Sequence, residues 1–394
     1  MAMRVVTSCF SRFTIFDQAA QLHRHGLLHR LITAAPATLA KKWGIPSAKV
    51  DSLFANFAIA YAHGKVARGL SEKLNSRLRK HTHDAFSARL ARHIPDQTDV
   101  LIGLSSFCYE AILEARNRGV RAIVDHGSLH EASVRKILLK EVDKFGFLLS
   151  GNSAQSWLIE KEDAEFHAAD HVFALSEVAK RTMVENGIAP AKIFVNHGGV
   201  ALAHFFPCGI GDGVFRIIHC SSLTPWKGLH YLLQAFRELA LPNAELWIIG
   251  PDLGLREDAI FDRLVRRLCT LGVSFKGQVP QLQLRTFFSQ GSVFVLPSLA
   301  DGFGLVVPQA MACRLPVIVS DMTGAADLVR EGENGFVVPA GDVEALKEKL
   351  QFLYDHREIC GEMGRRAQKT VAFEGTWDEY GNRLTAFLTR LGPS

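Results

Sequence analysis

The segment LPSLADGFGLVVPQAMACRLP, residues 296–316, carries the clearest structural signal in the chain. An apolar run over residues 293–296 ends at a Pro-Ser pair, and Gly302 and Gly304 follow before an amphipathic segment that contains Gln309. A strand that passes through a glycine loop into a helix is the unit of a parallel α/β sheet, and the free amides at a helix start stabilise anionic oxygens. The alternative is that the two glycines only form a tight turn.

Short apolar runs alternate with longer amphipathic segments along the rest of the chain. Runs that are apolar throughout are typical of strands covered by helices on both faces. Repeated strand–helix–strand units predict doubly wound parallel sheets with right-handed crossovers. The predicted strands include residues 4–8, 28–33, 100–105 and 121–125 in the first half, and residues 215–221, 245–250, 273–276, 293–296, 316–320 and 336–339 in the second.

The length of 394 residues exceeds what one hydrophobic core usually organises. Pro207 and three glycines cluster between residues 203 and 213, which is the composition of a linker. We therefore predict an α/β protein with two facing Rossmann-like, doubly wound domains, residues 1–205 and 206–375. Residues 376–394 are expected to form a final helix that crosses back to the first domain.

Composition excludes several classes of protein. Hydrophobic residues make up 48% and charged residues 22%, which is typical of a folded globular chain. No apolar run reaches the ~18 residues of a membrane span, and the apolar stretch at the start is too short for a signal peptide, so we expect a cytoplasmic protein. The seven cysteines lack a C-x-x-C pair and are expected to be free thiols. A net charge of +5, spread along the chain, does not indicate a nucleic-acid partner.

Residues 65–83 form the most basic segment and are predicted to be one amphipathic helix. One interpretation is a solvated helix face. The other is a patch that contacts anionic lipid headgroups at the inner membrane face, or an anionic acceptor.

A second segment that contains a candidate ligand-binding residue is CSSLTPWKG, residues 220–228. It follows the first predicted strand of the second domain and places Lys227 just before Gly228 and a helix. A lysine on such a loop can bind a phosphate as a point charge. The alternative is an ordinary exposed loop lysine.

The two segments together resemble the retaining glycosyltransferases of family 4, which have the GT-B fold. That family has two Glu residues separated by seven positions around Gly-Phe-Gly, and here Asp301 and Gln309 stand in their places as D-x7-Q. The family landmarks matched are Lys227-Gly228, Gly302-Phe303-Gly304, and residues 310–313, 316–318 and 335–338.

The resemblance implies that the second domain binds a nucleoside-diphosphate sugar. Lys227 would lie on the diphosphate, Asp301 beside the transferred sugar and Gln309 on the ribose. Ser222 stands where the family usually has a second basic residue, which puts one phosphate contact in doubt. The donor-binding residues implied are Ser222, Gly228, Gly302, Phe303, Gly304, Leu305 and Gln309.

The first domain offers His126 as the third catalytic candidate, beside Lys227 and Asp301. It follows a predicted strand, at the height where the family often has a histidine near the transferred sugar, and Asp125 is its rival. The other interpretation is a histidine packed in the core.

We predict a metal-independent enzyme without a cofactor, because no metal-ligand spacing is evident and a lysine can replace a cation beside a phosphate. By resemblance it transfers a sugar with retention to an acceptor hydroxyl on a glycan, a lipid-linked or a small molecule, in polysaccharide or glycoconjugate biosynthesis. The alternatives are a nucleotide-sugar-binding protein without transfer activity, or another GT-B enzyme such as a phosphorylase or an epimerase.

Overall fold

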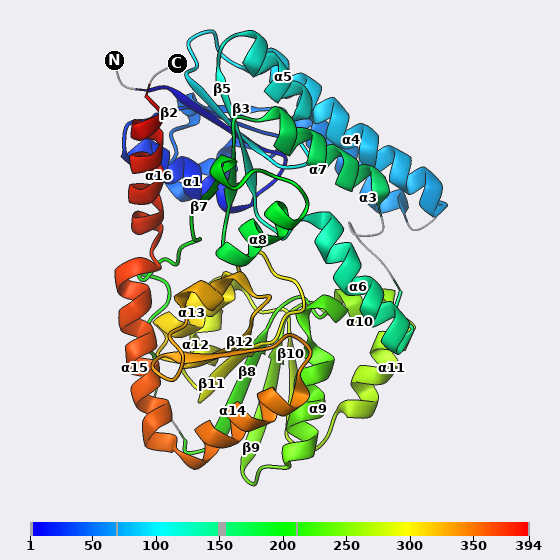
Figure 1. The fold of residues 1–394 in the computed structure, drawn as a ribbon, viewed down its shortest axis with the longest axis vertical. Coiled ribbons are helices and arrows are strands. Elements are labelled where there is room, and N and C mark those ends of the chain that lie inside the picture. The colour runs from blue at the N-terminus through cyan, green and yellow to red at the C-terminus, as the bar shows by residue number, and fades with distance from the viewer. Residues whose placement is uncertain (1–2, 68–69, 149–154, 210–211, 393–394) are drawn as a thin grey trace.

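The computed structural model describes residues 3–67, 70–148, 155–209 and 212–392. Figure 1 shows two α/β domains, one above the other, each built around its own sheet. All strand pairs within the described residues are parallel. The predicted pair of doubly wound domains is therefore confirmed.

The first sheet has seven strands in the order β3-β2-β1-β4-β5-β6-β7. Its inner strands are apolar and buried, because helices cover both faces of the sheet. The strands are β1 (Val5–Cys9), β2 (Leu28–Thr33), β3 (Val50–Ser52), β4 (Val100–Leu104), β5 (Arg121–His126), β6 (His171–Ala174) and β7 (Ile193–Val195).

The second sheet has six strands in the order β10-β9-β8-β11-β12-β13. Strand order reverses between β8 and β11, and in sheets of this kind ligands bind beyond the carboxyl ends of the strands at such a point. The strands are β8 (Phe215–Cys220), β9 (Ala244–Ile249), β10 (Val273–Gly277), β11 (Val293–Leu296), β12 (Val317–Ser320) and β13 (Gly335–Val338).

Helices connect most of the strands. In the first domain the longer ones are α1 (Thr14–Arg24), α3 (Phe54–Val66), α4 (Glu72–His93), α5 (Tyr109–Asn117), α6 (Glu131–Phe145), α7 (Ser156–Ala168) and α8 (Glu177–Glu185). In the second domain they are α9 (Leu229–Leu239), α10 (Leu253–Glu257), α11 (Ala259–Leu268), α12 (Leu284–Phe288), α13 (Val306–Ala312), α14 (Val343–Asp355) and α15 (Arg357–Glu374), and α16 (Trp377–Leu391) ends the chain.

The final helix, α16, returns to the first domain and packs against α1 (Figure 1). Tyr380, Leu384 and Leu388 are buried in the same core cluster as β1 and α1. The Tyr380 hydroxyl accepts a hydrogen bond from Gln18 Nε2 at 2.9 Å. The chain thus connects the two domains at the turn between α15 and α16 as well as through residues 196–209.

A third connection lies at α6, which reaches from the first domain down to the second (Figure 1). Phe147, just beyond α6, is buried in the core of the second domain beside Phe261. On α6 itself, Glu141 accepts hydrogen bonds from His230 Nε2 at 3.1 Å and from the Tyr231 hydroxyl at 2.9 Å. These contacts join α6 to α9, the helix that begins after Lys227.

The prediction of one continuous helix over residues 65–83 was wrong. Helix α3 ends at Val66 and α4 begins at Glu72, so the segment contains parts of two helices, and residues 68–69 between them lie outside the described residues. Ser71 caps the start of α4, because its hydroxyl accepts a hydrogen bond from the Leu74 amide at 3.4 Å.

Candidate active site

The loop between β11 and α13 forms the centre of the candidate site, at the carboxyl end of the second sheet. It touches the first domain directly. A Cβ built on Gly302 would lie 2.4 Å from the carbonyl oxygen of Gly127 and 2.6 Å from the Cα of Ser128. The Ser176 hydroxyl also donates to the Gly302 carbonyl at 2.7 Å. Glycine is therefore required at position 302 by the approach of the two domains.

The neighbouring glycine, Gly304, has a different role. Its backbone is left-handed, with φ of +79°, a conformation that favours glycine. The turn it makes leads into α13, which begins at Val306. Within the described residues, the amides of Gly304 and Leu305 donate no hydrogen bond to another group of the protein.

Lys227 and Asp301 meet across the mouth of this loop. Lys227 Nζ lies 2.5 Å from Asp301 Oδ2, and the two side chains are 18% and 12% exposed. The other carboxylate oxygen of Asp301 accepts a hydrogen bond from the Phe303 amide at 3.3 Å. Gly228 positions the lysine: it has φ of +70°, and a Cβ there would lie 2.0 Å from the Pro297 carbonyl oxygen.

A cavity of about 280 Å³, named cavity A, opens beside this ion pair. Its walls come from both domains, with Phe13, Gly127 and Leu175 from the first. The second domain contributes Cys220, Ser221, Ser222, Lys227, Leu296, Asp301, Phe303, Gly304, Leu305 and Val306. Six of the sequence-predicted residues, Ser222, Lys227, Asp301, Phe303, Gly304 and Leu305, thus face one space.

A second interdomain cavity, named cavity B, has a volume of about 530 Å³ and shares Phe13 and Leu305 with cavity A. Gln309 lines it and is buried, and its Oε1 has no hydrogen-bond partner among the described residues. The rest of its wall is formed by Arg12, Thr14, Asp17, Lys42, Trp43, Gly199, Val200, Ala201, His204, Phe205, Gln281, Leu282 and Trp377. The two shared residues show that the cavities are neighbours.

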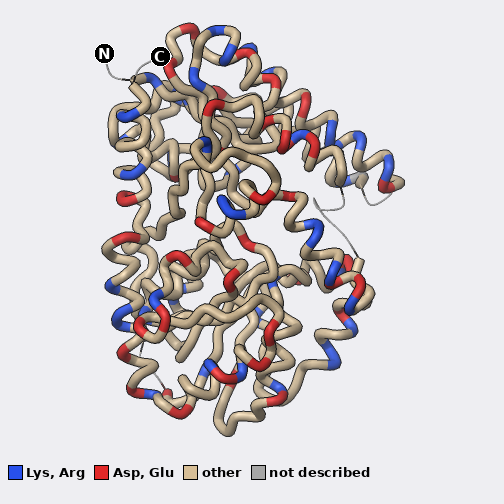
Figure 2. Tube along the Cα trace, in the orientation of Figure 1, with Lys and Arg blue, Asp and Glu red and all other residues tan. Residues whose placement is uncertain are grey.

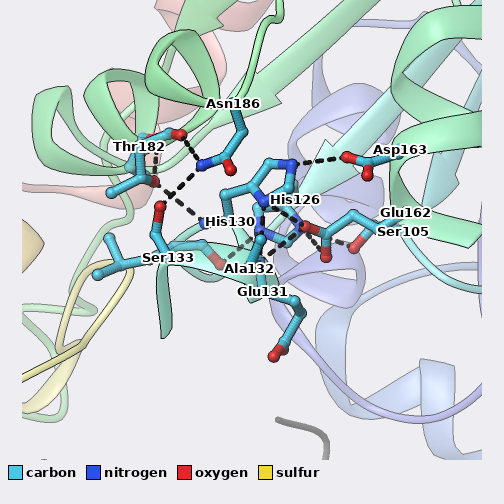
Figure 3. A network of polar contacts seen from close by, with 12 residues as sticks. Ser105, His126, His130, Glu131, Ala132, Ser133, Glu162, Asp163, Thr182 and Asn186 are labelled. Carbon is cyan, nitrogen blue, oxygen red and sulfur yellow. Dashed lines mark hydrogen bonds and ion pairs between the residues drawn. The ribbon is translucent and has the colours of Figure 1, made fainter. Parts of the chain in front are cut away.

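His126 does not line either cavity. It is the last residue of β5, and its side chain is turned into the first domain (Figure 3). Its Nε2 donates to the Leu129 carbonyl at 3.1 Å, and its Nδ1 accepts from the Ser105 hydroxyl at 2.9 Å. Gly127, the next residue, lines cavity A instead. A catalytic role for His126 therefore stays a prediction, and a direct contact with the sugar is not what this geometry favours.

Figure 3 shows that His126 belongs to a buried polar network around the start of α6. His130 Nε2 donates to Asp163 Oδ1 at 2.8 Å, and Glu162 accepts from the Glu131 amide at 2.9 Å. Burial lowers the pKa of His126 and raises the pKa of Glu162 to about 8. The network is thus held largely by neutral groups and fixes α6 against α7.

Asp125, the rival of His126, is also turned away from the cavities. Its Oδ2 accepts a hydrogen bond from Gln18 Nε2 at 2.9 Å, on the side of the sheet that α1 and α16 cover. Burial raises the pKa of Asp125 to about 7.

Sequence reasoning missed several residues of the site. Ser221 lines cavity A and its hydroxyl lies 2.8 Å from Nε2 of His219, a buried histidine whose pKa burial lowers to about 4. In cavity B the missed residues are Lys42, Trp43 and Gln281, which no strand-end pattern marks. A strand-end search could have found Ser221, since it follows β8 directly.

The part of the chain that the structure describes contains neither a candidate metal cluster nor a candidate membrane span. No group of three or more His, Cys, Asp or Glu side chains in that part of the chain could hold a metal ion. Nor does any helix there combine the length and the apolar character needed to cross a membrane. All seven cysteines are free thiols in this structure.

Comparison with known families places the candidate site within a matched domain. Residues 203–370 match the family described as "Glycosyl transferases group 1". Over 297 residues the chain is 28% identical to the capsular polysaccharide biosynthesis glycosyltransferase CapM of Staphylococcus aureus, covering 68% of this chain and 73% of that protein. It is 29% identical over 162 residues to the O-antigen chain mannosyltransferase B of Escherichia coli, covering 40% of this chain and 42% of that protein.

Solved structures share the fold over the whole chain. Sucrose-phosphate synthase from Thermosynechococcus elongatus superposes with a TM-score of 0.71 at 17% identity, covering 99% of each chain. Anabaena HepE in complex with UDP and glucose superposes with a TM-score of 0.69 at 16% identity, covering 98% of this chain and 99% of that one. Both domains and the loop between them thus have the GT-B fold of the superposed structures, and residues 203–370 match the family of group 1 glycosyltransferases.

Proposed function

We propose that the chain transfers a sugar from a nucleoside-diphosphate sugar to an acceptor hydroxyl, with retention of configuration and without a metal ion. One observation carries the proposal: Lys227 and Asp301 face the same interdomain cavity, and that cavity shares two wall residues with a neighbouring cavity lined by Gln309. A nucleotide sugar has the matching parts, a sugar and diphosphate for cavity A and a nucleoside for cavity B.

The hard step is departure of the diphosphate, because negative charge develops on the oxygen that leaves the sugar. Lys227 is placed to neutralise that charge, and the amides of Gly304 and Leu305 can donate to phosphate or sugar oxygens. Fixed donors at such a position typically contribute about 3–4 kcal/mol to the transition state. In the ligand-free protein Lys227 is paired with Asp301. The diphosphate of the donor must therefore take the place of Asp301 as the partner of Lys227.

The composition of cavity A also favours a particular route for the proton. Among the described residues that line cavity A, Asp301 is the one carboxylate, and it is paired with Lys227. We infer that the bond from the anomeric carbon to the diphosphate breaks as the bond to the acceptor oxygen forms on the same face. The departing phosphate oxygen then takes the proton of the acceptor hydroxyl, and no separate protein base is needed.

The acceptor is proposed to be a growing polysaccharide or glycoconjugate. The relatives that support this are named for capsular polysaccharide and O-antigen synthesis, and the superposed Anabaena structure holds UDP.

The test begins with a thermal-shift screen against nucleoside diphosphates and their sugars, since a ligand that binds only the native state raises its stability. The donor so found is then supplied in labelled form with glycan and lipid-linked acceptors, in the presence of a chelator. A new glycoside with the anomeric configuration of the donor supports the proposal. Free sugar phosphate or an epimerised nucleotide sugar would assign another GT-B reaction, and binding without any product would assign a binding protein.

Two single lysine variants, one in the site and one on the surface, provide a matched comparison. Lys227→Ala is expected to lower the turnover number about a hundredfold or more. Lys369→Ala, an exposed position on α15, is expected to leave it unchanged. Equal activity of the two variants would remove the assignment of Lys227 to the diphosphate.

A further inference from the structure

Helix α3 is inverted with respect to solvent. Its apolar side chains Phe54, Ile59 and Tyr61 are 50%, 60% and 58% exposed. Two of its polar residues face the protein, whereas Lys65 is exposed: Asn56 is buried and accepts a hydrogen bond from Arg89 at 3.0 Å, and the part-buried His63 lies 3.1 Å from Asn75 of α4. A helix in contact with water usually has the opposite arrangement.

The adjacent helix, α4, packs against α3 and also exposes apolar and basic side chains. Leu74 and Leu78 are exposed on it, and so are the neighbouring cations Lys73 and Arg77. Within the described residues no ion pair involves either of these cations. Figure 2 shows Lys and Arg along α4 as far as the projecting end of the hairpin. We name these two helices, residues 54–66 and 72–93, the α3–α4 hairpin.

The acidic residues of the hairpin do not cancel this charge. Glu72 pairs with Arg79 at 2.6 Å, and Asp84 pairs with Lys80 at 2.8 Å and with Lys161 of α7 at 2.6 Å. Both carboxylates are therefore paired with cations of α4 or α7. The outward face keeps a positive charge next to exposed aromatic and aliphatic side chains.

We propose that the α3–α4 hairpin is a docking surface for an anionic phospholipid bilayer, with α3 lying in the interface. Apolar side chains flanked by unpaired cations match the acyl boundary and the charged headgroups of such a surface. A second copy of the chain fits less well, because a two-fold contact would bring the same cations together. A nucleic acid would neutralise the cations and leave Phe54, Ile59 and Tyr61 uncovered. This inference goes beyond the proposed function and its test needs neither donor nor acceptor.

The experiment measures sedimentation of the full chain with vesicles of phosphatidylcholine alone and with about 30% phosphatidylglycerol. The double variants Ile59→Ser/Tyr61→Ser and Lys73→Glu/Arg77→Glu are each expected to lower the partition coefficient on anionic vesicles about tenfold or more. Binding should also fall with added salt, and more steeply for the native hairpin than for the charge-reversed one.

Matched controls lie far from the hairpin. Leu271→Ser removes a fully exposed leucine of the second domain, and Arg365→Glu/Lys369→Glu reverses two exposed charges on α15. Both are expected to bind as the native chain does. Thermal unfolding is measured for every variant, and the substituted positions are exposed, so unchanged melting is expected.

Three results would overturn the proposal. The first is a native chain that does not sediment with anionic vesicles. The second is equal loss of binding in the hairpin variants and in the controls. The third is a dimer in light scattering that Ile59→Ser/Tyr61→Ser converts to a monomer, since that would assign the apolar face to a second copy.

Discussion

Replacing Asp301 by Asn separates two roles that the site combines. In the ligand-free structure the Asp301 carboxylate lies 2.5 Å from Lys227 Nζ, where a diphosphate is proposed to bind. The carboxylate therefore competes with the ligand for the lysine and also repels its charge. We expect Asp301→Asn to bind a nucleoside diphosphate more tightly than the native enzyme while it transfers sugar more slowly.

The magnitude follows from the geometry of the pair. Two unit charges at about 4 Å attract each other by about 4 kcal/mol at an effective dielectric constant of ~20. Desolvation and hydrogen bonding to water offset most of this attraction at a partly exposed site, which leaves a net value of about 1 kcal/mol. Release of the lysine should therefore lower the dissociation constant of the nucleoside diphosphate about three- to tenfold. Loss of the carboxylate beside the sugar should lower the turnover number about a hundredfold.

The assay combines isothermal titration with the nucleoside diphosphate and initial rates with its sugar. Glu362→Gln, which removes a carboxylate paired with Arg366 on the surface of α15, serves as the control and should change neither quantity. If Asp301→Asn weakened diphosphate binding tenfold and left transfer intact, Asp301 would be a ligand of the nucleotide and the assignment to the sugar would be wrong.

Three further predictions concern the interdomain contact, the buried network and the connection through α6. Gly302→Ala places a methyl group 2.4 Å from a carbonyl oxygen of the first domain, so transfer should fall more than tenfold and the melting temperature should drop. Gly361→Ala on the exposed surface of α15 is the control: it should leave transfer unchanged and should not lower the melting temperature, because Ala is a better helix former than Gly. Burial raises the pKa of Glu162 from 4.5 to about 8, so the unfolded chain loses this proton at a lower pH than the folded protein, and the folded protein loses stability as pH rises from about 4.5 to about 8. Glu162→Gln should therefore have a higher melting temperature than the native protein at pH 8 but not at pH 4.5. An equal change in melting temperature at both pH values would contradict this. Phe147→Ala should cost about 3–5 kcal/mol of unfolding free energy in a denaturant titration, because it empties a packed site in the second domain, while truncation of the exposed Phe373 should cost less than about 0.5 kcal/mol.

The sequence predicts those parts of the fold that depend on local patterns of apolar residues. The apolar runs around residues 215–221 and 293–296 became strands, since a run of that composition and length has few other uses in a chain of this class. Lys227 and Asp301 could be brought together from sequence because both follow strands that are neighbours in one sheet. Parallel strands end at the same edge, so residues just beyond them meet.

The side-chain directions at a strand end could not be predicted in the same way. Asp125 and His126 are consecutive in β5 and point to opposite faces of the sheet, one toward Gln18 and the other toward Ser105. Helices cover both faces there, so neither side chain reaches the cavities. The backbone of Gly127, which has no side chain to turn away, forms the wall instead. A pattern that locates the end of a strand does not say which atom is exposed there.

The inverted helix α3 was missed for a related reason. Its apolar residues are those of an ordinary core helix, and only the tertiary structure shows that Asn56 and His63 are inside and Ile59 is outside. The partners of these polar groups are Arg89 and Asn75 of the next helix, α4, and their contacts with α3 could not be read from the sequence.

The four residues Asp301-Gly302-Phe303-Gly304 combine ligand contact and domain contact in consecutive positions. Asp301 forms an ion pair with Lys227, the residue proposed to bind the diphosphate. Gly302 lies against the backbone of the first domain at Gly127. Phe303 stacks on His197 of the interdomain linker, with ring centroids 6.1 Å apart. A ligand that displaces Asp301 from Lys227 therefore acts on the residue directly before the point where the domains touch. Because Gly302 leaves no room for a side chain, a small movement of this loop must be transmitted to Gly127 rather than absorbed. If the proposed donor binds Lys227, we therefore expect its binding to be coupled to the relative placement of the domains through the peptide unit between Asp301 and Gly302.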